Sequence, residues 1–364
     1  MERVVTSGNE QRLRDTVTWI DRSENVMEGS RVVFIAGDGR SGGTLLGQIL
    51  NGLSDSVYVG ELRNIWHEAF EQNEPCGCGE RFRHCEFWRA VVEKAFGSFE
   101  QLDVSAMLSM HKSLARERYT PMLMLLNRVP AELLGSELPR VYEDALSRLY
   151  RAIREVAGKS VVVDSSREVS QALILARIPG IDLRVLHLVR DSRAVAFSNS
   201  RGKPIFRSDN DASQHRKPEW ISSASRKLAF DEDGATRILL RQGAVASALQ
   251  WTWRNAWASG IPHSRHRRIP YTRLRYEDLV RDPREAIGGA LDRLGLGRPD
   301  LSMIQGTHVQ LGVNHAVSGN PVKFSSGGVD LRIDDEWREK MKGSDRKVVS
   351  VITSPLMHQY GYVI

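Results

Sequence analysis

The sequence predicts an α/β protein in which helices flank a doubly wound parallel sheet, with a helical insertion in the chain. A short apolar run at residues 31–36 is followed at once by glycines and then by a helical pattern over residues 44–53. Similar β-rich runs recur at residues 160–164, 183–189 and 271–276, with helical patterns between them. Short buried strands that alternate with helices are typical of a parallel sheet covered on both faces.

Composition sets broad limits on function. The chain has 364 residues, of which 41% are hydrophobic and 26% are charged, as in an ordinary globular protein. The net charge of +6 is a mild excess that suits an anionic ligand without requiring one. The basic residues are scattered and no recognition motif appears, so we expect no nucleic-acid partner.

The chain divides into an N-terminal arm, residues 1–29, and one domain, residues 30–364. The arm mixes charges throughout and lacks the apolar core of a secretory signal, and no stretch approaches the length of a membrane span. We therefore expect a cytoplasmic protein with no integral membrane segment. Within the domain, residues 62–155 are expected to form a mainly helical insertion. Residues 200–235 are expected to form a long polar loop, which in a compact domain is usually functional or mobile.

Further elements complete the chain. A helical pattern runs over residues 238–258, and another runs over residues 283–295. A glycine-rich stretch at residues 318–328 precedes a final helix that begins at Asp334.

The segment between the first strand and the first helix, residues 37–44, reads GDGRSGGT. Its glycines allow a tight turn, and the helix that follows presents free N–H groups, so this P-loop-like geometry binds phosphate. The nucleotide-triphosphatase pattern G-x-x-x-x-G-K-[ST] fits at Gly37, Gly42 and Thr44, but Gly43 stands where lysine is required. The basic residue is Arg40, which lies in the loop itself.

A second constellation follows the strand at residues 183–189. Arg190 closes that strand at its carboxyl end, where open α/β sheets bind ligands, and Ser198 lies eight residues further on. A guanidinium and a hydroxyl that converge on one phosphate form a sensible pair. The alternative is that Arg190 only pairs locally with Asp191.

The three cysteines form one cluster, Cys76, Cys78 and Cys85, with His84 beside them. Three thiols cannot all pair within the chain, so disulfides do not organise this fold. Four metal ligands within so short a segment would be unusual for zinc. We expect a locally packed loop and no metal, and a single disulfide such as Cys76–Cys85 stays open.

The loop and the segment VRDSRAVAFS (residues 189–198) together resemble the PAPS-dependent sulfotransferases, which use 3′-phosphoadenosine 5′-phosphosulfate. The form of the loop is closest to the carbohydrate, tyrosylprotein and related bacterial members. Other pieces resemble the family in the same order along the chain, from residue 31 to about residue 360. They are VGE at 59–61, DSSR at 164–167, RYEDL at 275–279 and GNPVKF at 319–324.

The resemblance implies that PAPS is the donor and PAP the product. The 5′-phosphosulfate would lie on the loop residues Gly39, Arg40, Ser41, Gly42, Gly43 and Thr44. Arg190 and Ser198 would hold the 3′-phosphate, with Tyr276 and Lys323 as further contacts. The acceptor would be a hydroxyl of a carbohydrate or another small molecule. The variable residues 62–155 and 200–235 would shape its site.

The resemblance also implies catalytic roles. Arg40 would neutralise the leaving phosphate oxygen, and Arg167 would stabilise the moving sulfuryl group where some relatives carry lysine. Glu61 would be the base that takes the acceptor's proton. No metal is required in principle, because the sulfuryl group carries less charge than a terminal phosphate. Four histidines are alternative bases, with His315 as the second choice: His67, His187, His308 and His315.

Two other function classes remain open at this stage. A P-loop kinase of a small molecule would use ATP and Mg²⁺ and hold the metal with Asp164, but the absence of lysine at Gly43 argues against it. A non-catalytic protein that binds nucleotides or polyanions would bind PAP without turnover. The sequence leaves the acceptor and the oligomeric state open.

Overall fold

The structure is a computed structural model that describes residues 29–129, 138–201, 242–265 and 269–364. It also describes the backbone of three short strands between residues 203 and 240. The expected N-terminal arm lies outside the described residues, apart from Gly29, and so does most of the expected loop at 200–235.

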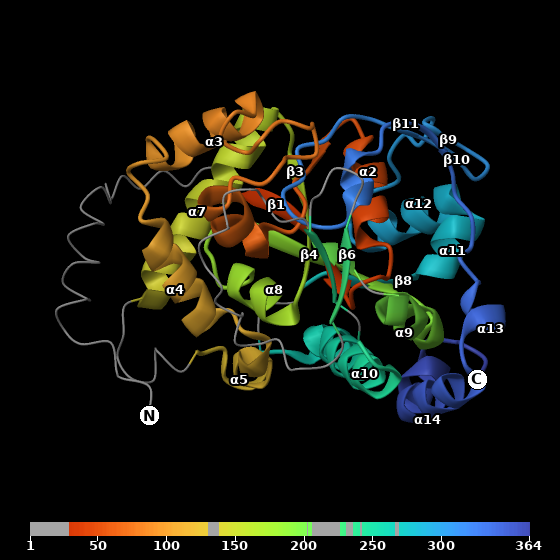
Figure 1. Cartoon of the computed structure of the whole chain (residues 1–364). Helices are drawn as coiled ribbons and strands as arrows, with labels where there is room; N and C mark the ends of the chain where they lie inside the picture. Colours follow the sequence, from red (N-terminus) through yellow and green to blue (C-terminus); the bar gives the residue numbers. More distant parts are fainter. Residues whose placement is uncertain are drawn as a thin grey trace, which may run out of the picture.

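The centre of the molecule is a five-stranded sheet with the order β2-β3-β1-β4-β8 (Figure 1). Every neighbouring pair is parallel, which confirms the predicted fold class. The strands are β1 (Ser30–Gly37), β2 (Ser56–Tyr58), β3 (Val161–Arg167), β4 (Ile181–Val189) and β8 (Tyr271–Arg275). The prediction missed β2 because three residues are too few to show a pattern. β1 lies between β3 and β4, so the later strands are added to the sheet on both sides of β1. In open parallel sheets, ligands bind at the carboxyl ends of the strands at such a switch point.

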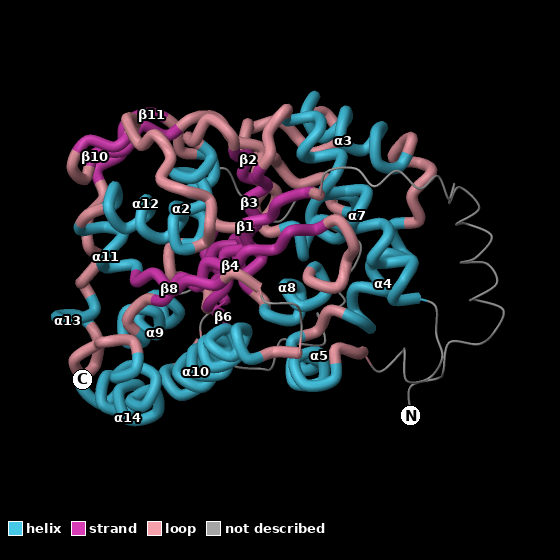
Figure 2. Tube along the Cα trace, turned by 180° about the vertical axis from the view of Figure 1, so that it is seen from behind, coloured by secondary structure: helices cyan, strands magenta, loops and turns pink. Residues whose placement is uncertain are grey.

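Alternate residues of β1 hold the two layers of helices against the sheet. Val32 and Phe34 pack in one buried cluster with α3 (Glu86–Phe96), α7 (Leu138–Ala157) and α8 (Val169–Leu175). Val33 and Ile35 pack in another cluster with α2 (Gly43–Asn51) and α12 (Pro283–Arg293). Side chains of a strand point alternately to its two faces, so an unbroken apolar run marks a strand buried on both. Figures 1 and 2 show the two groups of helices on opposite sides of the sheet.

Residues 62–155 are mainly helical where the structure describes them, with a non-helical loop at residues 72–85. Besides α3 and α7, the elements are η1 (Leu62–Asn64), the π-helix η2 (Ile65–Glu71), α4 (Val104–Leu114), η3 (Glu117–Tyr119) and α5 (Thr120–Leu126). The long helix α7 buries Tyr142, Leu146, Leu149 and Ile153, whose three- and four-residue spacing forms one apolar stripe.

The remaining helices come from the second half of the chain. They are α9 (Ser192–Arg201), α10 (Ala244–Gly260), η5 (Ile261–His263), α11 (Tyr276–Arg281), η6 (Pro321–Phe324), α13 (Trp337–Lys340) and α14 (Gly343–Gln359). Helix α14 packs against both α10 and α9, as Figure 1 shows at the lower edge of the molecule. A small antiparallel sheet joins β9 (Ile304–Gln305), β10 (His308–Leu311) and β11 (Gly327–Asp330).

The expectation of an irregular segment at 200–235 was wrong in part. The chain there contains β5 (Lys203–Ile205) and β6 (Arg226–Phe230), which pair antiparallel with β7 (Thr236–Leu240). The helix expected from residue 238 therefore begins only at Ala244. Charged residues inside these short strands hide the alternation that marks a strand in the sequence.

Burial of His187 predicts a loss of stability in mild acid. Its ring lies between the Tyr271 hydroxyl (2.7 Å) and Asn255 Oδ1 (2.8 Å), and burial lowers its pKa to about 4. The unfolded chain therefore binds a proton near pH 6.5, whereas the folded protein does so only near pH 4. Between these values falling pH destabilises the protein by up to about 3 kcal/mol through this residue.

The measurement is the free energy of unfolding in denaturant from pH 7.5 to pH 4. We expect His187→Gln to flatten its pH dependence relative to the wild type. The control is His67→Gln, which changes an exposed histidine and should keep the wild-type slope. Equal slopes in all three proteins would contradict the prediction.

Candidate functional site

The glycine-rich loop lies at the carboxyl end of β1, where its backbone meets neighbouring elements closely. Gly42 has a φ of 94°, and a Cβ added there would lie 2.7 Å from the Tyr276 ring. Gly37 has a φ of 134°, and a Cβ there would lie 2.3 Å from the Leu188 carbonyl oxygen. Only glycine fits both the space and the backbone conformation at these two positions.

A buried carboxylate anchors the start of the loop. Asp38 Oδ1 accepts hydrogen bonds from the Gly39 N–H (2.8 Å), Gln250 Nε2 (2.9 Å) and Arg254 Nη1 (3.0 Å). Arg254 also contacts Glu117 at 2.6 Å, so it ties the loop to α10 and η3. Sequence reasoning missed Gln250 and Arg254, because no local motif marks two residues of a distant helix.

The two constellations predicted from the sequence meet at the loop. Arg40 Nε donates to Ser198 Oγ at 2.8 Å, and Arg190 Nη1 donates to the Arg40 carbonyl at 2.9 Å. The Arg190 guanidinium lies 4.6 Å from the centre of the Tyr276 ring, and its other side contacts Asp334 at 2.9 Å. Burial lowers the pKa of Arg40, and the charges of Arg190 and Arg167 lower it further.

Glu61 and Arg167 form a close ion pair beside this cluster. Arg167 Nη2 lies 2.6 Å from Glu61 Oε2, and the Glu61 side chain is buried. Arg167 Nη1 lies 2.7 Å from the point where a Cβ on Gly39 would stand. The Arg167 side chain therefore lies between the predicted base and the glycine-rich loop.

Both of the predicted catalytic arginines have an unusual backbone. Arg40 has a φ of 64° and Arg167 a φ of 69°, in the left-handed region that residues with a side chain seldom occupy. Such conformations cost about 1–3 kcal/mol each and gather at ligand-binding sites.

Several buried polar atoms around the loop have no hydrogen-bond partner among the described residues. They include Ser41 Oγ, Arg167 Nε and Arg190 Nε. Each carries a hydrogen that it can donate, and two of the three belong to cations. Each can donate to an oxygen of a bound anion, so these residues fit a ligand that carries phosphate or sulfate groups.

The segment at residues 318–324 lies against the first turn of α2. The Asn320 N–H lies 3.5 Å from Thr44 Oγ1, and Gly319 approaches both Thr44 and Glu61. Lys323, in contrast, is buried with its Nζ donating to the Pro75 carbonyl at 2.8 Å. Its ammonium group is thus engaged with the loop of the cysteines.

The four histidines considered as alternative bases have other contacts. His67 lies 2.6 Å from Glu71, and His308 lies 2.8 Å from Asp330. His187 is buried in β4, where its ring contacts the Tyr271 hydroxyl of the neighbouring strand β8. The Nδ1 atom of His315 faces Cys85 at 3.4 Å. Glu61 is therefore the base candidate that the structure brings to the loop.

Asp164 is committed to internal hydrogen bonds. Its Oδ1 accepts from the Ser166 N–H at 2.7 Å, and its Oδ2 accepts from the Tyr150 hydroxyl at 2.5 Å. The side chain is fully buried, which raises its pKa to about 6. A carboxylate in this state is poorly placed to hold Mg²⁺, as the kinase alternative requires.

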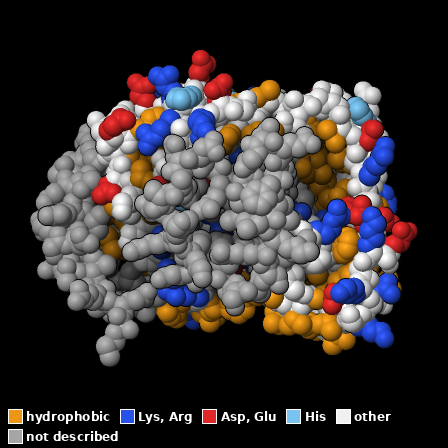
Figure 3. All heavy atoms as spheres, in the orientation of Figure 1, with side chains coloured by type: hydrophobic (Ala, Val, Ile, Leu, Met, Phe, Trp, Pro, Cys, Tyr) orange, Lys and Arg blue, Asp and Glu red, His pale blue; other side chains and the backbone are white. Residues whose placement is uncertain are grey.

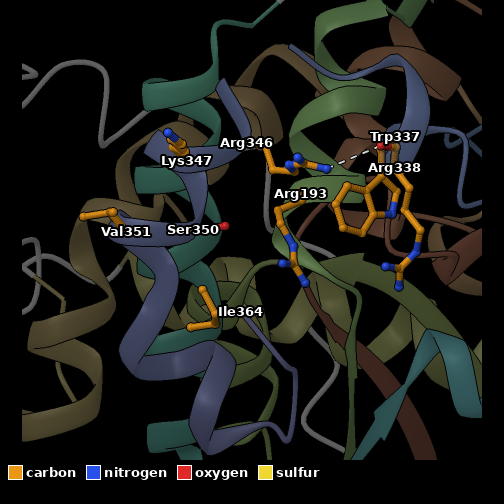
Figure 4. Close-up of a pocket in the computed structure, with 8 residues that line it drawn as sticks. All are labelled: Arg193, Trp337, Arg338, Arg346, Lys347, Ser350, Val351 and Ile364. Carbon is orange, nitrogen blue, oxygen red and sulfur yellow. Dashed lines mark hydrogen bonds between the residues drawn. The ribbon is translucent and has the colours of Figure 1, made fainter. Parts of the chain in front are cut away.

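A pocket of about 510 Å³ lies apart from the loop, between α9, α13 and α14 (Figure 4). Arg193 and Trp337 line it, with the guanidinium 4.7 Å from the centre of the indole. Asp191 already holds Arg193 through two hydrogen bonds, of 2.7 and 3.0 Å. None of the predicted site residues lines this pocket.

On the face in Figure 3, both basic and acidic side chains lie at the upper left and along the right side of the molecule. Within the part of the chain that the structure describes, every helix is too short or too polar to cross a membrane.

Comparison with known proteins shows the family of the chain that carries this parallel sheet, glycine-rich loop and cluster of arginines. The sequence profile described as "Sulfotransferase family" matches residues 32–300. The match spans more than half of the chain, which therefore belongs to the sulfotransferase family.

Particular relatives share parts of this chain. Human carbohydrate sulfotransferase 2 is 30% identical over 158 residues, which cover 38% of this chain and 28% of that protein. The mouse protein of the same name is 29% identical over the same shares. The alignment thus spans little more than a quarter of these relatives.

Two solved structures are also similar. A sulfotransferase domain from the curacin biosynthetic pathway has a TM-score of 0.42 and 16% identity, and the match covers 93% of this chain and 99% of that one. The sulfotransferase domain from the Synechococcus PCC 7002 olefin synthase has a TM-score of 0.44 and 18% identity, with 94% and 98% covered.

The crowding at Gly42 predicts a test of the loop. Gly42→Ala should lower the free energy of unfolding by about 1–2 kcal/mol for the left-handed backbone alone, with a further loss because the Tyr276 ring must move. The matched control is Gly43→Ala, whose Cβ would meet Ile35 at an ordinary 3.8 Å. The control should change stability by less than about 1 kcal/mol. Denaturant unfolding measures both, and equal losses would refute the account of the loop.

Proposed function

We propose that this protein moves a sulfuryl group from PAPS to a hydroxyl of a carbohydrate or another small molecule. One observation carries the proposal: Arg167 lies between the buried carboxylate of Glu61 and the glycine-rich loop. A phosphate on the loop and a hydroxyl at Glu61 would stand on either side of this guanidinium. An in-line transfer needs the donor and the acceptor on opposite sides of the moving group.

The donor side rests on the loop and on Arg190. The N–H groups from Gly39 to Thr44, at the start of α2, would bind the 5′-phosphosulfate oxygens, and the free Ser41 hydroxyl would add a donor. Arg190 would hold the 3′-phosphate with Ser198, while Tyr276 packs against its guanidinium. Ser198 Oγ already accepts from Arg40, so its own hydrogen is free to point to a phosphate oxygen.

The transfer itself depends on electrostatics. PAPS supplies a sulfuryl group on a phosphate leaving group, and negative charge grows on the bridging oxygen as that bond breaks. Arg40 is the loop's own cation, and we assign it to that oxygen. Arg167, with an unpaired Nε, would stabilise the equatorial oxygens of the moving group.

Glu61 would accept the hydroxyl proton as the acceptor attacks. Arg167 and Asn64 fix its carboxylate, with Asn64 Nδ2 at 3.3 Å from Oε2. A base whose position is fixed in this way meets the geometric requirement for general base catalysis. The kinase alternative receives no comparable support, because Asp164 is buried in hydrogen bonds and the chain belongs to the sulfotransferase family.

The donor assignment predicts specific stabilisation by PAP. A ligand that binds only the folded state raises the midpoint of thermal unfolding. We expect PAP to raise it, and ATP with Mg²⁺ to raise it less or not at all. Arg190→Ala should weaken PAP binding about 10- to 100-fold, the value of a charge-assisted hydrogen bond.

The matched control for Arg190→Ala is Arg281→Ala, which removes an exposed arginine and should keep the full PAP shift. A shift with ATP and Mg²⁺ alone would overturn the donor assignment. So would an Arg190→Ala protein that responds to PAP like the wild type.

The base assignment predicts separate effects on binding and on rate. With an acceptor found by screening carbohydrates and other hydroxyl compounds, Glu61→Gln should lower kcat about 100- to 10,000-fold. It should leave the PAP-induced thermal shift in place, because the carboxylate contacts the acceptor side. The control is Glu71→Gln, an exposed residue near the same segment, with wild-type kcat expected. An unchanged kcat in Glu61→Gln would show that a group other than Glu61 takes the proton of the acceptor hydroxyl.

A further inference from the structure

The structure brings four metal-binding side chains together away from the glycine-rich loop. The ligand atoms of Cys76, Cys78, Cys85 and His315 all lie within 4.8 Å of one another. Cys78 Sγ is 3.7 Å from Cys85 Sγ, and His315 Nδ1 is 3.4 Å from Cys85 Sγ and 3.8 Å from Cys76 Sγ. Cys76 and Cys85 are buried, and all three cysteines are free thiols.

These distances match the edges of a tetrahedral zinc site. With Zn–S bonds of about 2.3 Å and Zn–N bonds of about 2.0–2.1 Å, two sulfurs stand about 3.8 Å apart and a sulfur and a nitrogen about 3.6 Å apart. A disulfide would bring two sulfurs to about 2.05 Å. We propose that Cys76, Cys78, Cys85 and His315 bind one Zn²⁺ ion.

Backbone hydrogen bonds close the loop that holds the three cysteines, residues 76–85. The Cys76 N–H donates to the Glu80 carbonyl at 2.8 Å, and the Gly79 N–H donates to the Cys76 carbonyl at 2.9 Å. Gly79 has a φ of 96°, which closes the turn. These backbone contacts fix the turn that keeps Cys76 and Cys78 close to each other.

His315 comes from a distant part of the chain and is held in place. Its ring stacks on Phe87, with the centres 4.5 Å apart and the planes at 12°. Its carbonyl accepts a hydrogen bond from Trp88 Nε1 at 2.9 Å. His84, the histidine nearest to the cysteines in sequence, is exposed and is not part of the cluster. The expectation of no metal rested on the crowding of local ligands, and the distant His315 removes that objection.

Four protein ligands leave no open position, so the ion would be structural. Thiolate and imidazole ligands in tetrahedral geometry favour zinc over the harder cations. The site joins the cysteine loop to the segment at residues 314–318, since the Gly77 N–H also donates to the Ala316 carbonyl at 2.9 Å. A Cβ on Gly77 would lie 2.0 Å from Asn314 Oδ1, so the two segments touch.

The segment at residues 314–318 also contacts the candidate base, Glu61, and its neighbour Asn64. The Glu61 N–H donates to the Val317 carbonyl at 3.0 Å, and Asn64 Nδ2 donates to Ser318 Oγ at 2.9 Å. Lys323 adds a second link through its bond to Pro75, the residue before Cys76. Zinc would therefore hold the segment against which Glu61 is positioned. The metal assignment itself stands independently of the donor and the acceptor.

The first test is the metal content of the full chain, purified with a reductant and without chelators. Elemental analysis should find about one zinc per chain and no stoichiometric iron. Cys78→Ser and His315→Ala should each lose most of it. The matched control is His84→Ala, which should keep the wild-type content. Zinc-free wild-type protein, iron in place of zinc, or full zinc in His315→Ala would overturn the assignment.

A second measurement covers the case in which a variant fails to fold. Zinc in the wild type is exchanged for Co²⁺, whose absorption reports ligand type and geometry. Thiolate-to-metal and tetrahedral ligand-field bands are expected in the wild type and in His84→Ala. Removal of the metal with a chelator should lower the midpoint of thermal unfolding, because metal binding to a structural site is folding free energy. Absent thiolate bands, or an unchanged midpoint, would refute the proposal.

Discussion

The candidate site depends on keeping several cations close together at one end of a buried sheet. Arg40, Arg167 and Arg190 surround the glycine-rich loop, and burial together with their mutual repulsion lowers the pKa of Arg40. Two carboxylates offset part of this charge, because Glu61 pairs with Arg167 and Asp334 pairs with Arg190. The surrounding fold holds these cations together, and a bound anion with several oxygens would offset their mutual repulsion. Sulfuryl transfer uses an anion of this kind.

The fold supplies the rigidity that this crowding requires. β1 is buried on both faces, so the turn at its end is fixed in position. The Asp38 carboxylate fastens the start of that turn to α10 through Gln250 and Arg254. The left-handed backbones of Arg40 and Arg167 are tolerated because neighbouring contacts determine them. Charge and strain are thus concentrated where the sheet, the loop and α10 meet.

The segment from residue 314 to residue 324 connects two features that the sequence presents separately. On one side it forms backbone hydrogen bonds with Val59 and Glu61. On the other it contacts the cysteine loop through His315 and Lys323. A brace at the cysteines would therefore act on the position of Glu61 through a short chain of direct contacts. Acceptor binding would meet a base already held in place.

The sequence by itself determined the parallel α/β fold, because unbroken apolar runs are long enough to mark β1, β3, β4 and β8. It also placed Arg40 in the loop and Arg190 at the carboxyl end of a strand, whereas Glu61 followed only from the resemblance to a known family. Tertiary structure alone decided that Arg254 anchors Asp38 and that His315, rather than His84, joins the cysteines. These pairs are hundreds of residues apart, and no local periodicity or spacing records which distant side chains the packed core brings into contact.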